Sequence, residues 1–250
     1  MQAVIRYQEN EWVVDFSLPI DISIPLRDDG TGLEAFYLPG AEYRPFRYGS
    51  TVLSTREGGA CNCEVLTIAP HGNGTHTECV GHISLEKLTI HECLKEFIVM
   101  SEVITITPEV SDEDACITRE SVAATLKHHT PAVILRTLPN EEEKMTRRYS
   151  GTNPPFLAVE AAEFLRDRGV KHLLLDLPSV DRETDGGALR AHHCFWDYPA
   201  SPRTEATITE LIYVPNSIPD GIYLLNIQIA SLQTDASPSK PVIYAVKANL

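Results

Sequence analysis

The sequence predicts one α/β domain with a mixed β-sheet and flanking helices, covering residues 1–250. Residues 155–168 show the helical spacing of apolar side chains, and a strand-like apolar run follows at residues 172–177. A helix followed at once by a strand is typical of parallel or mixed strand pairing. The C-terminal third adds strand-like runs separated by turns, at residues 206–214, 221–230 and 241–246. A chain of 250 residues with 43% hydrophobic residues can bury the core of one such domain.

The N-terminal quarter combines short strands with a long segment that has no regular period. Residues 12–16 and 21–24 have strand character. Residues 28–50 are rich in Gly, Pro, Asp and Tyr and predict a long irregular loop, a kind of segment that often carries function. Residues 61–69 alternate in polarity and predict a strand, which Pro70 ends.

The middle of the chain predicts further strands and a capped helix. Residues 97–106 and 132–137 are apolar, β-branched runs typical of buried strands. Between them, Thr118 is expected to cap a helix that extends to about residue 127. The charged run at residues 141–144 is expected to be a solvated loop.

Charge and composition exclude several classes of function. The formal net charge of −14 argues against nucleic acid and anionic membrane as partners, because both require basic patches. The first 16 residues are charged throughout and lack the apolar core of a signal peptide, and no apolar run is long enough for a spanning helix. Together these features predict a cytoplasmic protein. The six cysteines form no CxxC pair and are expected to be free thiols in a reducing compartment.

A short glycine-rich segment gathers three of the nine histidines with a carboxylate, at His71, His76, Glu78 and His82. Imidazole and carboxylate are the ligands of a borderline divalent metal such as zinc or manganese. In an extended run, His76 and Glu78 project to the same side and can bind one ion. The segment therefore predicts a metal-dependent hydrolase site, although surface or hydrogen-bonded core histidines are the alternative.

Two further candidates lie later in the chain, at His192 in the sequence Ala-His-His and at Glu210. Glu210 falls within an apolar strand pattern, where a carboxylate is costly to bury unless a cation compensates it. The alternative is that Glu210 faces water on an edge strand. Two histidine clusters far apart in the sequence are what a site assembled from two loops requires.

These residues resemble the putative cyclase family of metal-dependent hydrolases, which includes kynurenine formamidase (arylformamidase). Gly74-Thr75-His76, position 78 and His82 match the spacing of the family's metal-binding motif. Residues 176–181 (Asp-Leu-Pro-Ser-Val-Asp) match a second family motif, and 235–238 (Asp-Ala-Ser-Pro) match a segment before the last strand. The resemblance keeps its order over nearly the whole chain.

The resemblance implies a swivelling β/β/α fold, a homodimer or larger homo-oligomer, and a role for each matching residue. His76 and Glu78 are implied as metal ligands, with His192 and Glu210 completing the site, where a second ion could also bind. His82 is implied as the proton donor and acceptor. Zinc is the expected metal and manganese the alternative. His71 is a candidate ligand as well. The family's first histidine aligns with Gly72, however, so whether the side chain of His71 can reach the metal is left open.

The site also departs from the family pattern at Glu78, which replaces an aspartate, and at Val80, which replaces a proline. The glutamate extends the carboxylate by about 1.5 Å, one carbon–carbon bond. Together with the longer spacing from His192 to Glu210, these changes argue against formylkynurenine as the substrate.

The expected activity is therefore hydrolysis of an amide (C–N) or lactone bond in a small, cyclic or aromatic substrate. A metal-activated water would attack, and His82 would act as general acid and base. Tyr37, with Phe36 or Tyr43, could form an aromatic wall. The alternative function is a non-catalytic protein that binds a small ligand on the same scaffold with a degenerate metal site. Nucleophilic catalysis by Cys79 or Cys194 ranks last, because no motif orients either thiol.

Overall fold

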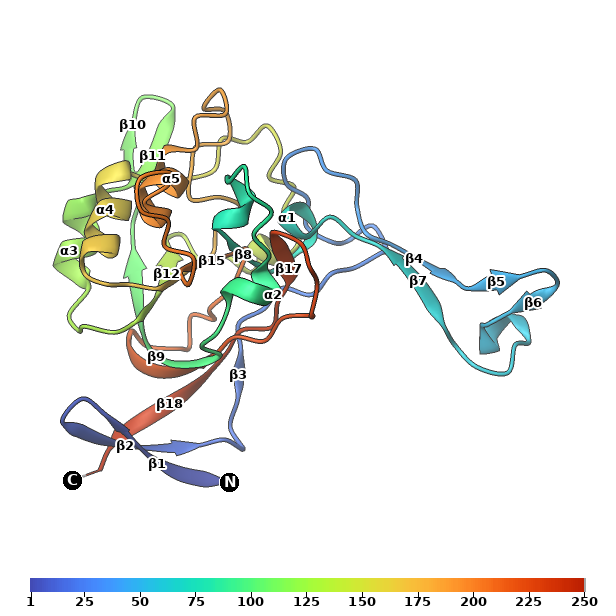
Figure 1. Ribbon diagram of the computed structural model, residues 1–250, viewed down its shortest axis with the longest axis horizontal. Helices are drawn as coiled ribbons and strands as arrows, with labels where there is room; N and C mark the ends of the chain where they lie inside the picture. The colour runs from blue at the N-terminus through green and yellow to red at the C-terminus, as the bar shows by residue number, and fades with distance from the viewer. Residues whose placement is uncertain (250) are drawn as a thin grey trace.

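A mixed β-sheet of eleven strands forms the body of the protein (Figure 1) in the computed structural model, which describes residues 1–249. In spatial order the strands are β1 (Gln2–Tyr7), β2 (Asn10–Asp15), β18 (Val242–Ala248), β16 (Gly221–Asn226), β9 (Ile98–Ile106), β12 (Ala132–Thr137), β14 (His172–Leu175), β15 (Thr207–Glu210), β8 (His76–Cys79) and β17 (Ala236–Pro238), with β3 (Ile20–Asp21) paired to β18. This arrangement confirms the predicted α/β class with a mixed sheet.

The four central strands β9, β12, β14 and β15 are parallel, and the strands outside them pair antiparallel. Parallel neighbours need a crossover, and helices supply it on one face of the sheet (Figure 1). These helices are α3 (Arg119–Thr125), α4 (Val159–Asp167) and α5 (Arg190–Trp196). The shorter helices are α1 (Pro70–Asn73) and α2 (Ile90–Cys93).

Alternate residues of the central strands supply two layers of core, one on each face of the sheet. Val133 and Leu173 belong to the cluster that includes Leu165 of α4. Ile134 and Leu174 belong to the cluster on the opposite face. Every residue of β12 and β14 is buried, as expected for strands covered on both faces.

Several predicted elements agree with the structure. The strand at residues 132–137 coincides with β12, and the Oγ1 of Thr118 accepts a hydrogen bond from Ser121 N at 3.2 Å to cap α3. The helix predicted from residue 155 begins later, at Val159, because the short strand β13 (Phe156–Leu157) precedes it. Helix α5 was not predicted, and neither was the strand pair β10 (Glu109–Ser111) and β11 (Asp114–Ile117).

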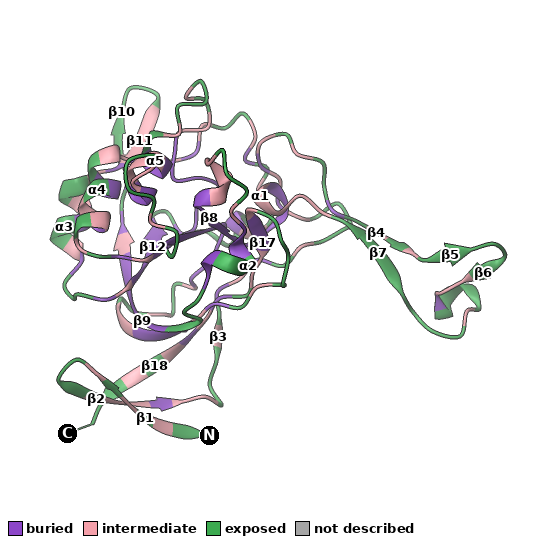
Figure 2. Cartoon of the chain, in the orientation of Figure 1, coloured by how far each residue is buried: buried purple, intermediate pink, exposed green. Residues whose placement is uncertain are grey.

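The prediction of an irregular loop at residues 28–50 is wrong in its second half. Strands β4 (Glu42–Pro45), β5 (Arg47–Tyr48), β6 (Thr51–Val52) and β7 (Glu64–Thr67), with the turn η1 (Thr55–Glu57), form a ribbon at residues 42–67 that projects from the body (Figure 1). We call this ribbon the arm. All four residues of β7 are exposed (Figure 2), so its alternating sequence does not reflect one buried face.

The expected solvated loop at residues 141–144 is correct for its glutamates but wrong for Lys144. This lysine lies in the 3-10 turn η3 (Glu142–Met145) and is buried. Its Nζ donates to Thr137 O and to Asp176 Oδ2, both at 2.7 Å. A run of charges does not show that one long side chain turns inward to pair with a buried carboxylate.

None of the helices in the described part of the chain has the length and apolar character needed to span a bilayer.

The Lys144–Asp176 pair provides a test of how this region is stabilised. We expect Lys144→Met to lower the free energy of unfolding by about 3–5 kcal/mol, because it leaves the buried Asp176 carboxylate without its charge partner. Urea denaturation followed by circular dichroism measures the change. The matched control is Lys127→Met at an exposed lysine, expected to change stability by less than about 0.5 kcal/mol. Equal effects of the two substitutions would contradict a stabilising role of the buried pair.

Candidate metal centre

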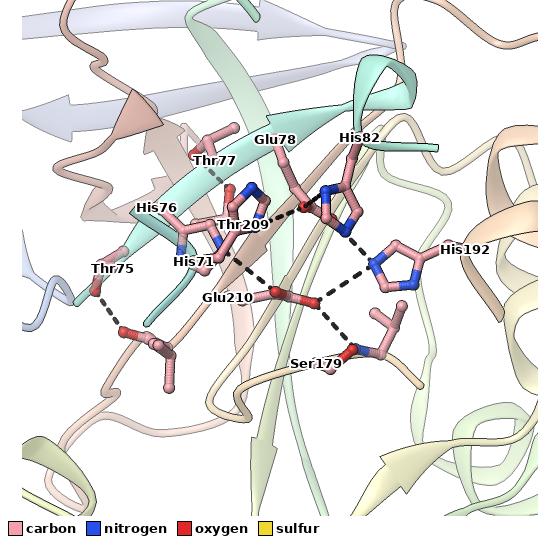
Figure 3. A network of polar contacts seen from close by, with 12 residues as sticks. His71, Thr75, His76, Thr77, Glu78, His82, Ser179, His192, Thr209 and Glu210 are labelled. Atoms are coloured by element: carbon pink, nitrogen blue, oxygen red, sulfur yellow. Dashed lines mark hydrogen bonds and ion pairs between the residues drawn. The ribbon is translucent and has the colours of Figure 1, made fainter. Parts of the chain in front are cut away.

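Strand pairing places His76, Glu78 and Glu210 together. Strands β8 and β15 are antiparallel, with His76 opposite Glu210 and Glu78 opposite Ile208. Residues two apart on a strand share a face, so Glu78 lies beside His76. His76 Nε2 is 3.3 Å from Glu210 Oε2, a contact marked by a dashed line in Figure 3. All three side chains are buried. Because β15 has neighbours on both sides, Glu210 does not face water on an edge strand.

His71 and His82 approach the same centre from the two ends of β8 (Figure 3). His71 lies on α1, just before the strand, and its Nδ1 is 3.3 Å from Glu78 Oε2. His82 lies on the 3-10 turn η2 (Val80–His82), just after the strand, and its Nδ1 is 3.9 Å from the same oxygen. His71, His76 and Glu78 each offer one ligand atom within 4.8 Å of the others. His71 therefore lies within reach of the same candidate ion site as His76 and Glu78.

The absence of a side chain at Gly72 has a steric cause. A Cβ added there would lie 2.8 Å from the carbonyl oxygen of Ala35 and 2.9 Å from Leu38 Cδ1. Distances below 3.0 Å are too short for real contacts, so the backbone here can approach its neighbour only as glycine. The position at which the resembling family carries its first histidine has no room for one. The residue before it, His71, carries an imidazole whose Nδ1 lies 3.3 Å from Glu78 Oε2.

His192 completes the group from helix α5, and Asp181 orients it. The Asp181 carboxylate accepts from the backbone N–H groups of Ala191 and His192, at 2.7 and 3.1 Å. It also lies 2.6 Å from His192 Nδ1, which turns Nε2 toward Glu78 Oε1 at 3.1 Å. Burial lowers the pKa of His192, but the Asp181 and Glu78 carboxylates outweigh it and raise the pKa to about 10.

Asp235, in the loop before β17, contacts two histidines at once. Its Oδ2 lies 2.9 Å from His71 Nε2 and 3.1 Å from His82 Nδ1. Burial lowers the pKa of His71, whereas Asp235 and Glu78 raise it, with a net result of about 10. Hydrogen bonds from His71 and His82 lower the pKa of Asp235 far below its usual range.

Asp181 and Asp235 were not among the predicted site residues. The only signals for them in the sequence were their places in the two matching segments at residues 176–181 and 235–238. A carboxylate in a matching segment can as well cap a helix or a turn, so position alone did not assign either residue to the site.

Two buried ligand atoms at the centre have no hydrogen-bond partner among the described residues: His76 Nε2 and Glu78 Oε2. Buried polar atoms are costly when unpartnered, and nearly all find a partner. Burial raises the pKa of Glu78, but His82, His192 and His71 hold it well below its usual range, so the carboxylate is ionised. Imidazole nitrogens around an ionised, buried carboxylate fit a borderline divalent cation.

A cavity of about 410 Å³ opens beside these residues, with His71, His82, His192 and Glu210 in its lining. Phe36, Leu38 and Leu189 contribute apolar surface to it. Of the three aromatic residues expected to form a wall, only Phe36 lines the cavity, whereas Tyr37 is mostly exposed and Tyr43 lies on the arm. Neither Cys79 nor Cys194 lines it.

The sequence is similar to two bacterial kynurenine formamidases over most of its length. Kynurenine formamidase of Bacillus cytotoxicus is 29% identical over 227 residues, which cover 90% of this chain and 96% of that protein. Kynurenine formamidase of Bacillus thuringiensis is 28% identical over 229 residues, covering 91% and 97%.

The fold is similar to solved structures at lower sequence identity. A predicted metal-dependent hydrolase from Bacillus stearothermophilus superposes with a TM-score of 0.64 at 16% identity, covering 91% of this chain and 98% of that one. Isatin hydrolase A from Labrenzia aggregata, bound to benzyl benzoate, superposes with a TM-score of 0.65 at 15% identity, covering 92% and 94%. The family model described as Putative cyclase matches residues 15–182, more than half of the chain. The chain therefore belongs to the putative cyclase family.

Proposed function

We propose that the chain is a metal-dependent hydrolase that cleaves an amide (C–N) or lactone bond of a small cyclic or aromatic substrate. The observation that carries the proposal is the pair of buried atoms His76 Nε2 and Glu78 Oε2, which make no hydrogen bond and face the other ligand candidates. The relatives named kynurenine formamidase and isatin hydrolase support a hydrolase of this class.

His71, His76, Glu78, His192 and Glu210 would hold the metal. The two oxygens of Glu78 face different partners, with Oε2 toward His71 and Oε1 toward His192, so this carboxylate could serve one ion or two. We propose zinc, with manganese as the alternative, because the donors are imidazole nitrogens and carboxylate oxygens. When bound, such an ion lowers the pKa of water and polarises a carbonyl group.

His82 is proposed as the general acid and base. It lines the cavity and its side chain is 27% exposed, in contrast to the buried His76 and His192. It can therefore take a proton from the attacking water and return it to the leaving nitrogen or oxygen. Phe36, Leu38 and Leu189 would pack against an apolar or aromatic substrate and exclude water from the reacting bond.

The alternative, a ligand-binding protein with a degenerate metal site, was motivated by the glycine at position 72. Its main support weakens because His71 lies 3.3 Å from Glu78 and can replace the missing imidazole. The predicted location in the cytoplasm and the single domain over residues 1–250 remain part of the proposal.

We also propose that the chain forms a homodimer or a larger homo-oligomer through its arm. Isolated two-stranded ribbons are marginally stable in water, so a projecting arm needs a surface to pack on. The arm exposes apolar side chains at Phe46, Tyr48, Val65 and Leu66. Large exposed apolar side chains on a projecting element favour burial against a partner, and a second copy of the chain is the partner that is always present.

Metal content and activity together test the proposed function. Purified wild-type protein should carry one or two equivalents of zinc or manganese, as measured by elemental analysis. His76→Ala removes a buried ligand and should lose both the metal and the hydrolysis of formamides, cyclic amides and lactones. His82→Asn should keep the metal and lower kcat by about 10²–10⁴-fold, the usual contribution of a general acid–base group.

The control for these variants is His91→Ala, at an exposed histidine outside the site, which should behave as wild type. A wild-type protein that contains no metal and takes up none on addition would contradict the hydrolase proposal and favour the ligand-binding alternative.

The raised pKa values predict that metal binding depends on pH. Neighbouring carboxylates raise the pKa of His71 and of His192 to about 10, which favours the protonated form of both rings at pH 7. A cation must displace a proton from each ring it binds, so zinc affinity should fall as the pH falls, by about tenfold per unit for each displaced proton. Titration calorimetry in buffers of different ionisation enthalpy should show release of about one or two protons at pH 7. Binding without proton release would contradict the assignment of these rings as ligands.

The arm provides a separate prediction on assembly. Size-exclusion chromatography with light scattering should give at least twice the chain mass of 27.7 kDa. Changing Val65 and Leu66 together to aspartate should shift the protein to monomer, because charges would enter a buried interface. The control is Val110→Asp on β10, where an apolar side chain is exposed away from the arm. A wild-type monomer at micromolar concentration would overturn the proposed assembly.

A further inference from the structure

One carboxylate, that of Asp235, serves two histidines of the centre. The rings of His71 and His82 lie with their centroids 4.4 Å apart and tilted by 30°. Asp235 Oδ2 contacts Nε2 of His71 and Nδ1 of His82, at 2.9 and 3.1 Å. The two rings therefore present different nitrogens to the same oxygen.

We infer that Asp235 is a positioning residue that fixes the tautomers of both histidines, an inference that rests on the proposed function. An ionised carboxylate only accepts hydrogen bonds, so the ring nitrogen that faces it carries the proton. A neutral His71 then has its lone pair on Nδ1, the atom that lies 3.3 Å from Glu78 Oε2. A neutral His82 has its lone pair on Nε2, the nitrogen that Asp235 leaves free for proton transfer.

Every other imidazole of the centre is held in the same way. His76 Nδ1 lies 3.1 Å from Gly74 O, and His192 Nδ1 lies 2.6 Å from Asp181 Oδ2. Histidines that bind metals usually donate their second N–H to such an oxygen, which sets the tautomer and the ring orientation. Asp235 thus contacts one ring nitrogen of His71 and leaves the other free, as Asp181 does for His192.

His71 has more need of such support than the other ligand candidates. Its side chain is 24% exposed, whereas those of His76 and His192 are 0% and 2% exposed. It also stands on a four-residue helix one position away from the family spacing. Packing alone holds His71 less firmly, and a fixed carboxylate compensates for this.

The backbone holds Asp235 in place independently of its side chain. The next residue, Ala236, pairs with Glu78 across β17 and β8, and Cys79 N donates to Asp235 O at 3.1 Å. This pairing is made by main-chain atoms alone, so substitution of the side chain should leave the strand in register. Variants at position 235 are therefore suited to test the role of the carboxylate.

The test compares zinc affinity in wild type, Asp235→Ala and Asp235→Asn by competition with a chelator. Loss of an outer carboxylate typically weakens metal binding by about 10–100-fold, which is the expected effect of Asp235→Ala. Asp235→Asn keeps an oxygen acceptor and should lose less. Glu86→Ala is the matched control, since it removes an exposed negative charge from the neighbouring groove without touching a ring.

A spectroscopic readout separates positioning from a general loss of charge. Long-range proton–nitrogen NMR of the zinc-loaded, histidine-labelled protein should show His71 protonated at Nε2 in wild type and a mixture of tautomers in Asp235→Ala. Wild-type zinc affinity and an unchanged His71 tautomer in Asp235→Ala would overturn this inference and leave the proposed metal site intact. A wild type that binds no zinc would overturn both.

Discussion

The antiparallel pairing of β8 with β15 is the contact on which the site depends. It places Glu78 and Glu210, which are 0% and 3% exposed, inside the sheet together with His76. Two carboxylates in such a position are costly unless positive charge lies beside them. The imidazoles of His71 and His192, whose pKa values the neighbouring carboxylates raise, lie beside Glu78, and a bound divalent cation would offset the cost further. The pairing of β8 with β15 thus buries two carboxylates, which is unfavourable, and also places His76 beside them.

The order of strands explains why ligands from distant segments meet. Strand β8 lies between β15 and β17 at one end of the sheet, although these strands come from residues 76–79, 207–210 and 236–238. Strand β15 carries Glu210, and the loop before β17 carries Asp235. The loop after β14 carries Asp181, which in turn orients His192 at the start of α5. The sheet therefore sets the positions of these candidate site residues, and short loops set their orientations.

The sequence predicted the parts of this arrangement that depend on local pattern. Alternation placed His76 and Glu78 on one face of a strand, and apolar runs identified β12 and β14. The burial of Glu210 could not be decided in this way, because a single strand pattern does not show which strand will cover it. The arm was missed for a related reason, since alternation in β7 occurs where both faces meet water. Lys144 and Asp235 act through contacts with residues more than 30 positions away, and local sequence carries no signal for such contacts.

The segment around Gly72 shows how the local backbone restricts where an imidazole can stand near Glu78. The close approach of Ala35 O and Leu38 to Gly72 leaves no room for an imidazole at the family position. The ring comes from the residue before, and Glu78, longer than the family's aspartate by about 1.5 Å, extends toward it. Both departures from the motif thus lie at one contact, since His71 and Glu78 are direct neighbours in the candidate site. Motif spacing alone did not decide whether His71 belongs to the candidate site, whereas its distance from Glu78 places it beside the other candidate ligands.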